Sequence, residues 1–125
     1  MNIGILISEK GSNMLNIAKA CDNGTLNARV KIVISNKPSE GIYKAQKIGI
    51  PTKIIETKNF NSKLKFENEI TNILKINKVS LVCLAGFMKI LSKKFVSQWE
   101  KRLINIHPSL LPSFKGINAQ LQAIK

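Results

Sequence analysis

The chain has 125 residues, of which 20 are Lys or Arg and 7 are Asp or Glu, so its formal net charge is +13. Its apolar runs are far too short for a transmembrane helix or a signal segment. At 44% hydrophobic residues it can build one core. We therefore expect one domain over residues 1–125, in the cytoplasm, with Cys21 and Cys83 as free thiols. A single histidine also argues against a metal site.

Buried strands and amphipathic helices alternate along the chain. In chain order, we predict strands at residues 2–8, 30–34, 52–55, 80–85 and 103–106, separated by helices that start near residue 12, span 41–48, follow a cap at Asn61 or Ser62, and span 92–99. This alternation predicts an α/β fold, a Rossmann-like open parallel sheet with helices on both faces.

The first candidate site is the turn Gly11-Ser12-Asn13 between the first strand and its helix. A helix start offers unpaired N–H groups and a positive dipole, and glycine lets the main chain approach a ligand closely. The turn is therefore a candidate phosphate cradle. The residues alone support equally well the alternative that Ser12 or Asn13 is only an N-cap.

The second candidate site is the pair Asn105 and His107 at the end of the buried strand predicted at 103–106. Pro108 stops that strand, and open parallel sheets bind ligands at such ends. An amide can stabilise a developing oxyanion, and an imidazole can exchange a proton near neutral pH, so the pair suits acyl transfer. Composition alone favours the alternative of a histidine that merely ends a strand.

The third segment, residues 81–91, reads as a buried strand, a small-residue turn and an apolar stretch. Alone it would be an ordinary core strand. However, Asn105 to His107, the Pro-Ser-Leu-Leu-Pro that follows and Gly116 resemble the signature of the folate-dependent formyltransferase family. The Gly-Ser-Asn turn resembles the phosphate loop of the family's glycinamide ribonucleotide formyltransferases, and segment 81–91 resembles its folate-binding segment. All three occur in the family's order and spacing.

This resemblance implies transfer of a formyl group from 10-formyltetrahydrofolate to the amine of glycinamide ribonucleotide, in purine biosynthesis and without a metal. It also implies roles for individual residues. His107 would be the general acid and Asn105 would stabilise the oxyanion and contact the cosubstrate; Gly11, Ser12 and Asn13 would hold the phosphate; Met88, Lys89, Ile90 and Leu91 would hold the pterin; and Lys63 would be a basic residue near the cosubstrate. For Lys63, a solvated lysine at a helix start is the favoured alternative.

Several positions depart from the family pattern. The family commonly has glycine where this chain has Glu9, and histidines where it has Asn118 and Gln120. The family also has an aspartate that orients the catalytic histidine, whereas no acidic residue follows Glu100 in this chain. We therefore expect the N-terminal portion of the family's domain, without its C-terminal strands and lid, and with weak or absent activity. A fragment, a natural truncation and a decayed copy all fit. The strand at 103–106 would then have an open edge for self-association.

Two other function classes remain. A non-catalytic phosphate-ligand binder would keep the Gly-Ser-Asn cradle and ignore folate. The positive charge suggests nucleic acid, but only Arg29 and Arg102 are arginine, aromatic residues are 6% of the chain and the lysines are scattered, so no stacking platform is visible. We expect only non-specific, salt-sensitive binding to polyanions, and no membrane partner.

Overall fold

The computed structural model describes residues 1–106 and residue 117. Five parallel strands form one sheet in the order β3-β2-β1-β4-β5. The strands are β1 (Asn2–Ile7), β2 (Arg29–Ser35), β3 (Thr52–Ile54), β4 (Leu81–Leu84) and β5 (Leu103–Asn105). Each lies within one residue of its predicted bounds, and the predicted parallel sheet is confirmed.

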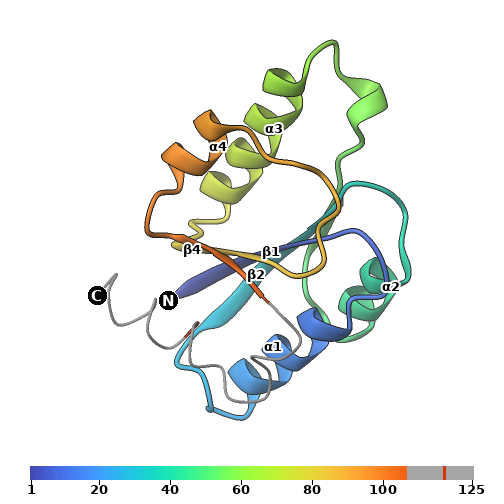
Figure 1. Ribbon diagram of the computed structural model, residues 1–125. Coiled ribbons are helices and arrows are strands. Elements are labelled where there is room, and N and C mark those ends of the chain that lie inside the picture. The colour runs from blue at the N-terminus through green and yellow to red at the C-terminus, as the bar shows by residue number, and fades with distance from the viewer. Residues whose placement is uncertain (107–116, 118–125) are drawn as a thin grey trace.

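Helices cover both faces of the sheet, as predicted (Figure 1). They are α1 (Ser12–Asp22), α2 (Glu40–Lys47), the 3₁₀ turn η1 (Thr57–Asn59), α3 (Lys63–Ile76) and α4 (Lys93–Gln98). In Figure 1, α1 and α2 lie on one side of the strands, and α3 and α4 on the other. The chain winds outward from β1 to β3 and then returns to β4 beside β1, so the strand order reverses between β1 and β4. Open α/β sheets bind ligands at such a switch point.

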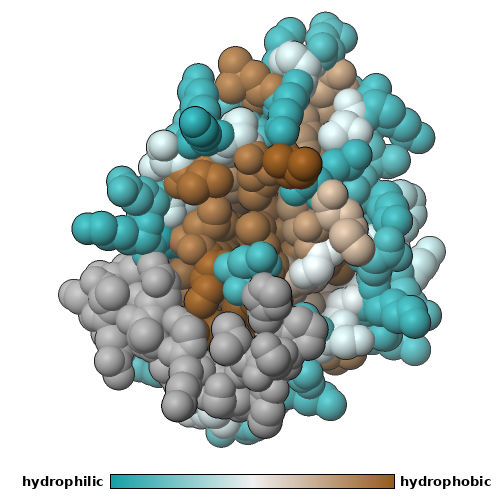
Figure 2. Space-filling model, in the orientation of Figure 1, coloured by the Kyte–Doolittle hydropathy of each residue, from teal (hydrophilic) through white to brown (hydrophobic). Residues whose placement is uncertain are grey.

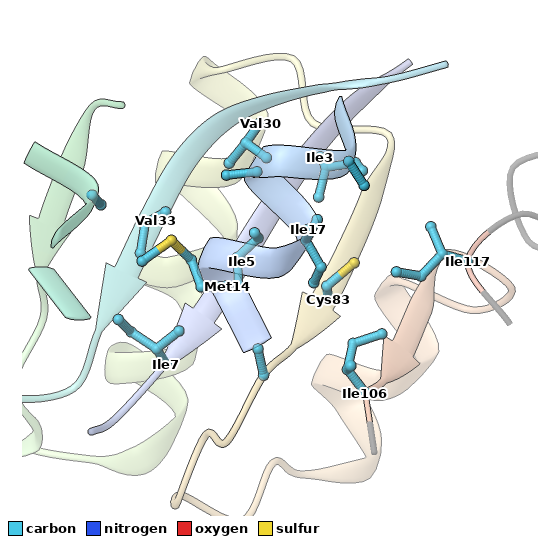
Figure 3. Close-up of a cluster of buried hydrophobic side chains, with 14 of the residues drawn as sticks. Ile3, Ile5, Ile7, Met14, Ile17, Val30, Val33, Cys83, Ile106 and Ile117 are labelled. Carbon is cyan, nitrogen blue, oxygen red and sulfur yellow. The ribbon is translucent and has the colours of Figure 1, made fainter. Parts of the chain in front are cut away.

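The central strand β1 explains why the fold has two cores. Its side chains alternate between the faces, and from Ile3 to Ile7 the hydrophobic ones are fully buried. Ile3, Ile5 and Ile7 lie on the face of the sheet that α1 covers and pack with α1, α2 and Ile117 (Figure 3). Leu6 faces α3 and α4 instead. This burial on both sides is typical of a parallel sheet and accounts for the continuous apolar run.

The second core contains the largest fully buried side chains of the described residues. Phe66 of α3, Phe95 of α4 and Trp99 are all less than 3% exposed and pack with Leu6 and Val82 of the sheet. Glu67, next to Phe66, is also buried. This core fixes α3 and α4 to the sheet, and with them the segment that joins β4 to α4.

The strand β5 is less buried than predicted. Leu103 and Ile104 are half-buried and Asn105 is exposed, because β5 is the edge strand of the sheet over residues 1–106. Figure 2 shows the same side of the molecule, where hydrophobic surface crosses the middle, in the region in which Figure 1 draws β5.

Within the described part of the chain, no helix has the length and hydropathy needed to cross a membrane.

Candidate functional site

The predicted phosphate cradle begins at Gly11, which is the N-cap of α1. Gly11 has φ 74° and ψ 24°, a left-handed conformation that glycine adopts without strain. No side chain caps the helix, so the alternative that Ser12 or Asn13 is the N-cap is wrong. Ser12 is exposed and Asn13 half-buried. Among residues 1–106 no side chain accepts a hydrogen bond from the first-turn N–H groups, which suits an anion ligand.

Helix α2 packs unusually close to this cradle. A Cβ atom on Gly11 would lie 2.8 Å from the Cα of Gly41, and one on Gly41 would lie 2.5 Å from Ile7 Cδ1. The N–H of Gly41 donates a hydrogen bond of 3.0 Å to the carbonyl of Glu9. Two glycines are therefore needed for the start of α2 to support the turn that carries the cradle.

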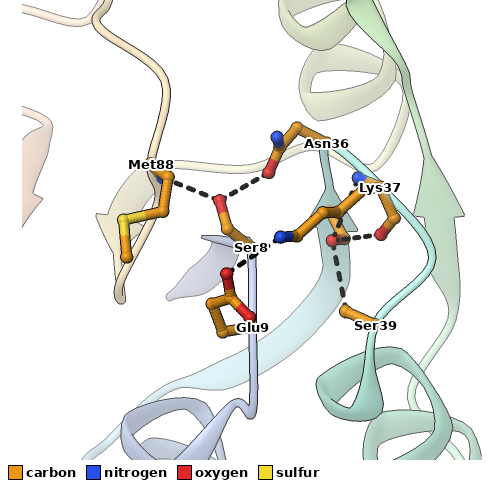
Figure 4. A network of polar contacts seen from close by, with 7 residues as sticks. Ser8, Glu9, Asn36, Lys37, Ser39 and Met88 are labelled. Atoms are coloured by element: carbon orange, nitrogen blue, oxygen red, sulfur yellow. Dashed lines mark hydrogen bonds and ion pairs between the residues drawn. The ribbon is translucent and has the colours of Figure 1, made fainter.

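The charge of Glu9 beside the cradle is compensated by an ion pair. Lys37 Nζ lies 2.8 Å from Glu9 Oε1, and both side chains are about half exposed. Figure 4 shows this ion pair between the loop after β1 and the loop after β2. Glu9 is therefore paired with a lysine 28 residues further along the chain.

Ser8 joins three loops at the carboxyl edge of the sheet. Its hydroxyl is fully buried, accepts a hydrogen bond of 2.7 Å from the N–H of Met88 and donates to Oδ1 of Asn36 (Figure 4). A serine hydroxyl has one proton and two lone pairs, so both contacts are made at once. The loops after β1, β2 and β4 therefore share one buried polar contact point.

The predicted pterin segment, residues 88–91, follows β4 at the same edge. Met88 and Ile90 are 68% and 83% exposed, Lys89 is exposed, and Leu91 is half-buried against the second core. The segment ends at Ser92, whose N–H and hydroxyl both donate to the carboxylate of buried Glu67. The apolar side chains of Met88 and Ile90 are thus exposed to solvent, while buried Ser8 and Glu67 bond to the main chain at the two ends of the segment.

Asn105 is the last residue of β5 and pairs in register with Leu84 of β4. Its exposed side chain therefore lies at the carboxyl edge, near the segment that follows β4. His107, Gly116, Asn118 and Gln120 lie outside the described residues, so the relation between Asn105 and His107 stays a prediction.

Lys63 is the first residue of α3 and is exposed. Within the described residues, no hydrogen bond or ion pair joins its side chain to segment 88–91 or to any other residue. The N-cap of α3 is Ser62, whose hydroxyl accepts from the N–H of Lys65 at 3.2 Å. Between the two predicted cap residues, the structure therefore selects Ser62.

A cavity of about 480 Å³ lies at the opposite end of the sheet from these groups. It is formed by the end of α1, the start of β2 and the residues after α2, and Cys21 lines it. Burial raises the pKa of Cys21 to about 11 and raises that of Cys83 further. None of the residues predicted for the site lines this cavity, so we do not assign it to the reaction.

Over residues 1–106 and 117, no three His, Cys, Asp or Glu side chains are grouped as metal ligands would be.

Sequence reasoning missed five residues that shape this edge: Ser8, Asn36, Lys37, Gly41 and Glu67. Each of them contacts a partner that is 25 or more residues away in the sequence. Only Ser8 carried a signal, a polar residue at the end of a buried strand. The others depend on which loops the topology brings together.

Comparison with known proteins agrees with this geometry. The formyl transferase family model matches residues 1–125. The trifunctional purine biosynthetic protein adenosine-3 of Gallus gallus is 44% identical over 120 residues, covering 95% of this chain and 12% of that protein. The phosphoribosylglycinamide formyltransferase of Haemophilus influenzae is 40% identical over 124 residues, covering 98% of this chain and 58% of that protein.

The fold is also shared with solved structures. The crystal structure of phosphoribosylglycinamide formyltransferase from Brucella melitensis matches with a TM-score of 0.82 and 39% identity, covering 98% of this chain and 66% of that one. The chain thus spans less than two thirds of the length of these relatives. With the family model matched from the first residue to the last, the chain belongs to the formyl transferase family.

Proposed function

We propose that this chain carries the substrate-binding and catalytic groups for transfer of a formyl group from 10-formyltetrahydrofolate to the amine of glycinamide ribonucleotide. The amine nitrogen would form a bond to the formyl carbon, giving a tetrahedral oxyanion. The bond from that carbon to N10 of the folate would then break, and the proton lost by the amine would end on N10. Relatives named as phosphoribosylglycinamide formyltransferases support this assignment.

One observation carries the proposal. The cradle at Gly11 follows β1, the segment 88–91 follows β4, and Asn105 is the last residue of β5. These three strands are neighbours in the sheet, so all three groups lie at its carboxyl edge. The reaction requires that two substrates meet in the correct orientation. It therefore needs one group that holds the phosphate, a second that holds the pterin and a third that donates a hydrogen bond to the oxyanion.

The chain's own residues would divide the work as follows. Ser12, Asn13 and the N–H groups at the start of α1 bind the ribose phosphate, with Gly11 allowing the close approach. The main chain of residues 88–91 binds the pterin edge, with Lys63 as a basic residue near the cosubstrate. Asn105 donates a hydrogen bond to the oxyanion, and His107 moves the proton as general acid.

A formyl-transfer assay with the purified 125-residue chain tests this proposal. We expect slow transfer, because no acidic residue follows Glu100 to hold the His107 imidazolium. Asn105→Ala should lower the rate by about 10² to 10³, the effect of losing one oxyanion donor, and His107→Ala should abolish transfer. Asn27→Ala, an exposed asparagine at the opposite end of the sheet, is the matched control.

Calorimetry separates the enzyme from the non-catalytic alternative. An enzyme binds both glycinamide ribonucleotide and folate, whereas a phosphate-ligand binder takes only the first. Binding of neither ligand, together with no transfer, would contradict the proposed function.

A further inference from the structure

Buried polar side chains from two other elements hold the segment 88–92 at both of its ends. The N–H of Met88 donates to Ser8 Oγ at 2.7 Å, and the N–H of Ser92 donates to Glu67 Oε2 at 2.7 Å. Ser8 is fully buried and Glu67 is only 3% exposed. Ser8 lies just after β1 and Glu67 on α3, so the two ends of the segment are held by different parts of the fold.

These contacts fix the backbone firmly. The hydroxyl proton of Ser8 is donated to Asn36, so a lone pair is aimed at Met88. The carboxylate of Glu67 accepts from both the N–H and the hydroxyl of Ser92. Burying a carboxylate is costly unless it is hydrogen-bonded, and within the described residues Ser92 supplies all of its hydrogen bonds. The carboxylate therefore serves the segment, since within the described residues it accepts no hydrogen bond from its own helix.

Most side chains between the anchors do little to hold the segment. Met88 and Ile90 are 68% and 83% exposed, and only Leu91 packs against the second core. The path of the main chain is therefore set from inside by Ser8 and Glu67. Ser8 also lies three residues before Gly11, so the same short stretch ends in the phosphate cradle.

We infer that Ser8 and Glu67 are positioning residues that hold the main chain of residues 88–92 in place for the pterin. This inference rests on the proposed function of that segment. Ser8 takes up the N–H of Met88, which leaves the carbonyl of Met88 and the backbone of residues 89–91 for the ligand. Ser8 also ties the pterin segment to the phosphate cradle, and so sets the distance between the two substrates.

Amide hydrogen exchange of the free chain, measured by NMR, tests the structural half. Ser8→Ala should speed exchange at Met88 by about tenfold, the equivalent of one lost hydrogen bond. Ser35→Ala is the matched control, because Ser35 is equally buried but bonds to the carbonyl of Lys37 instead. Exchange at Met88 that is the same in Ser8→Ala as in the unaltered chain would overturn the inference.

The other anchor is tested in the same way. Glu67→Ala should speed exchange at Ser92 by about tenfold. Glu67→Gln keeps an acceptor oxygen and should restore much of the protection. Glu69→Ala, two residues along the same helix, is the control and should leave Ser92 unchanged. If Ser8→Ala does not fold, this pair of Glu67 variants carries the test.

Binding of two probes then tests the functional half. Ser8→Ala and Glu67→Ala should raise the Kd for 5-formyltetrahydrofolate by about tenfold, with Glu67→Gln close to the unaltered chain. Glu67→Ala should leave the Kd for ribose 5-phosphate unchanged, a split that a general loss of structure would not produce. Equal weakening of both probes would overturn the positioning role.

The two proposals fail in different ways. If the unaltered chain binds no folate while the exchange results hold, the pterin assignment fails. If folate binds equally well to every variant, the proposed function stands and the positioning role of Ser8 and Glu67 is wrong.

Discussion

Lys37 Nζ lies 2.8 Å from Glu9 Oε1 and so neutralises the one carboxylate that the sequence puts two residues before Gly11. The pair joins the loops after β1 and β2 beside the cradle (Figure 4). A chain with glycine at position 9, the family's common residue, would need no such partner. Glu9 and Lys37 are thus best understood as one unit.

The first prediction concerns this pair. Lys37→Met leaves the negative charge of Glu9 uncompensated near the phosphate, so affinity for ribose 5-phosphate should fall by about two- to fivefold, the scale of an exposed ion pair. Calorimetry at low and high salt measures this, and the loss should shrink as salt screens the charge.

Glu9→Gly together with Lys37→Met is the control for that experiment and should bind about as well as the unaltered chain. A double variant as weak as Lys37→Met alone would show that Lys37 contacts the phosphate itself, contrary to this explanation.

The second prediction concerns the glycines where α2 meets the cradle. Gly11→Ala should lower the free energy of unfolding by more than Gly49→Ala does. Both have positive φ, which costs alanine about 1 to 2 kcal/mol, but a Cβ at Gly49 meets nothing within 4 Å, whereas one at Gly11 meets Gly41 at 2.8 Å. Urea unfolding followed by the fluorescence of Trp99, the chain's single tryptophan, measures both.

Gly41→Ala extends this test to a glycine whose φ is not positive, so only the added Cβ is tested. Its Cβ would lie 2.5 Å from Ile7 Cδ1 and 3.1 Å from the carbonyl of Glu9, so we expect a loss of about 1 to 3 kcal/mol from overpacking. Equal stability of the Gly11→Ala and Gly49→Ala variants would argue against a tight contact at the cradle.

The third prediction concerns the two cysteines, of which Cys21 is partly buried and Cys83 is buried. Burial raises the pKa of Cys21 from its usual 9.0 to about 11. The unfolded chain therefore loses this proton at lower pH than the folded one, so the contribution of Cys21 to stability is complete below pH 9.0 and is lost as the pH rises through about 11. Cys21→Ser should lose less stability than the unaltered chain between pH 9 and 11 in urea titrations.

Thiol labelling checks the same point independently. At pH 8, Ellman's reagent should react slowly with Cys21 and Cys83 in the folded chain and rapidly after unfolding in guanidinium, since the thiolate is the reactive form. Rapid reaction of Cys21 in the folded chain would contradict the raised pKa.

The fourth prediction concerns the edge of β5. The carbonyl of Arg102 and the N–H of Ile106 bond to β4, so the alternation of a strand turns the backbone groups of Leu103 and Asn105 the other way. Over residues 1–106 no strand pairs with that side. We expect association that grows with concentration in light scattering, reduced in Asn105→Lys by a charge on the edge. A monodisperse monomer at high concentration would rule this out.

The fold was predictable because its signals are local. Continuous apolar runs such as that of β1 mark strands buried on both faces, and turn residues such as Gly11 and Gly49 mark where helices begin or end. The edge position of β5 was not visible in the same way. Its apolar residues predict burial, but the order of strands in the sheet decides how much of them is covered.

The site was predictable only in part. A glycine turn before a helix has a physical signature, so Gly11 could be found, although a side-chain cap at Ser12 or Asn13 fitted the sequence equally well. The contacts of Ser8 with Met88 and of Glu67 with Ser92 span 80 and 25 residues. Such pairs depend on the three-dimensional arrangement of loops, which no local pattern contains.

The turn after α1, around Gly24, lies at the far end of the sheet from the cradle, because α1 runs antiparallel to the strands. Gly24 itself has a positive φ of 84°, which a side chain would strain, but Asn27, three residues further along the same connection to β2, is exposed. A dye, an affinity handle or a surface tether attached there would leave the opposite rim free for both ligands. This makes Asn27→Cys, in a background without Cys21, a practical anchor for single-molecule work.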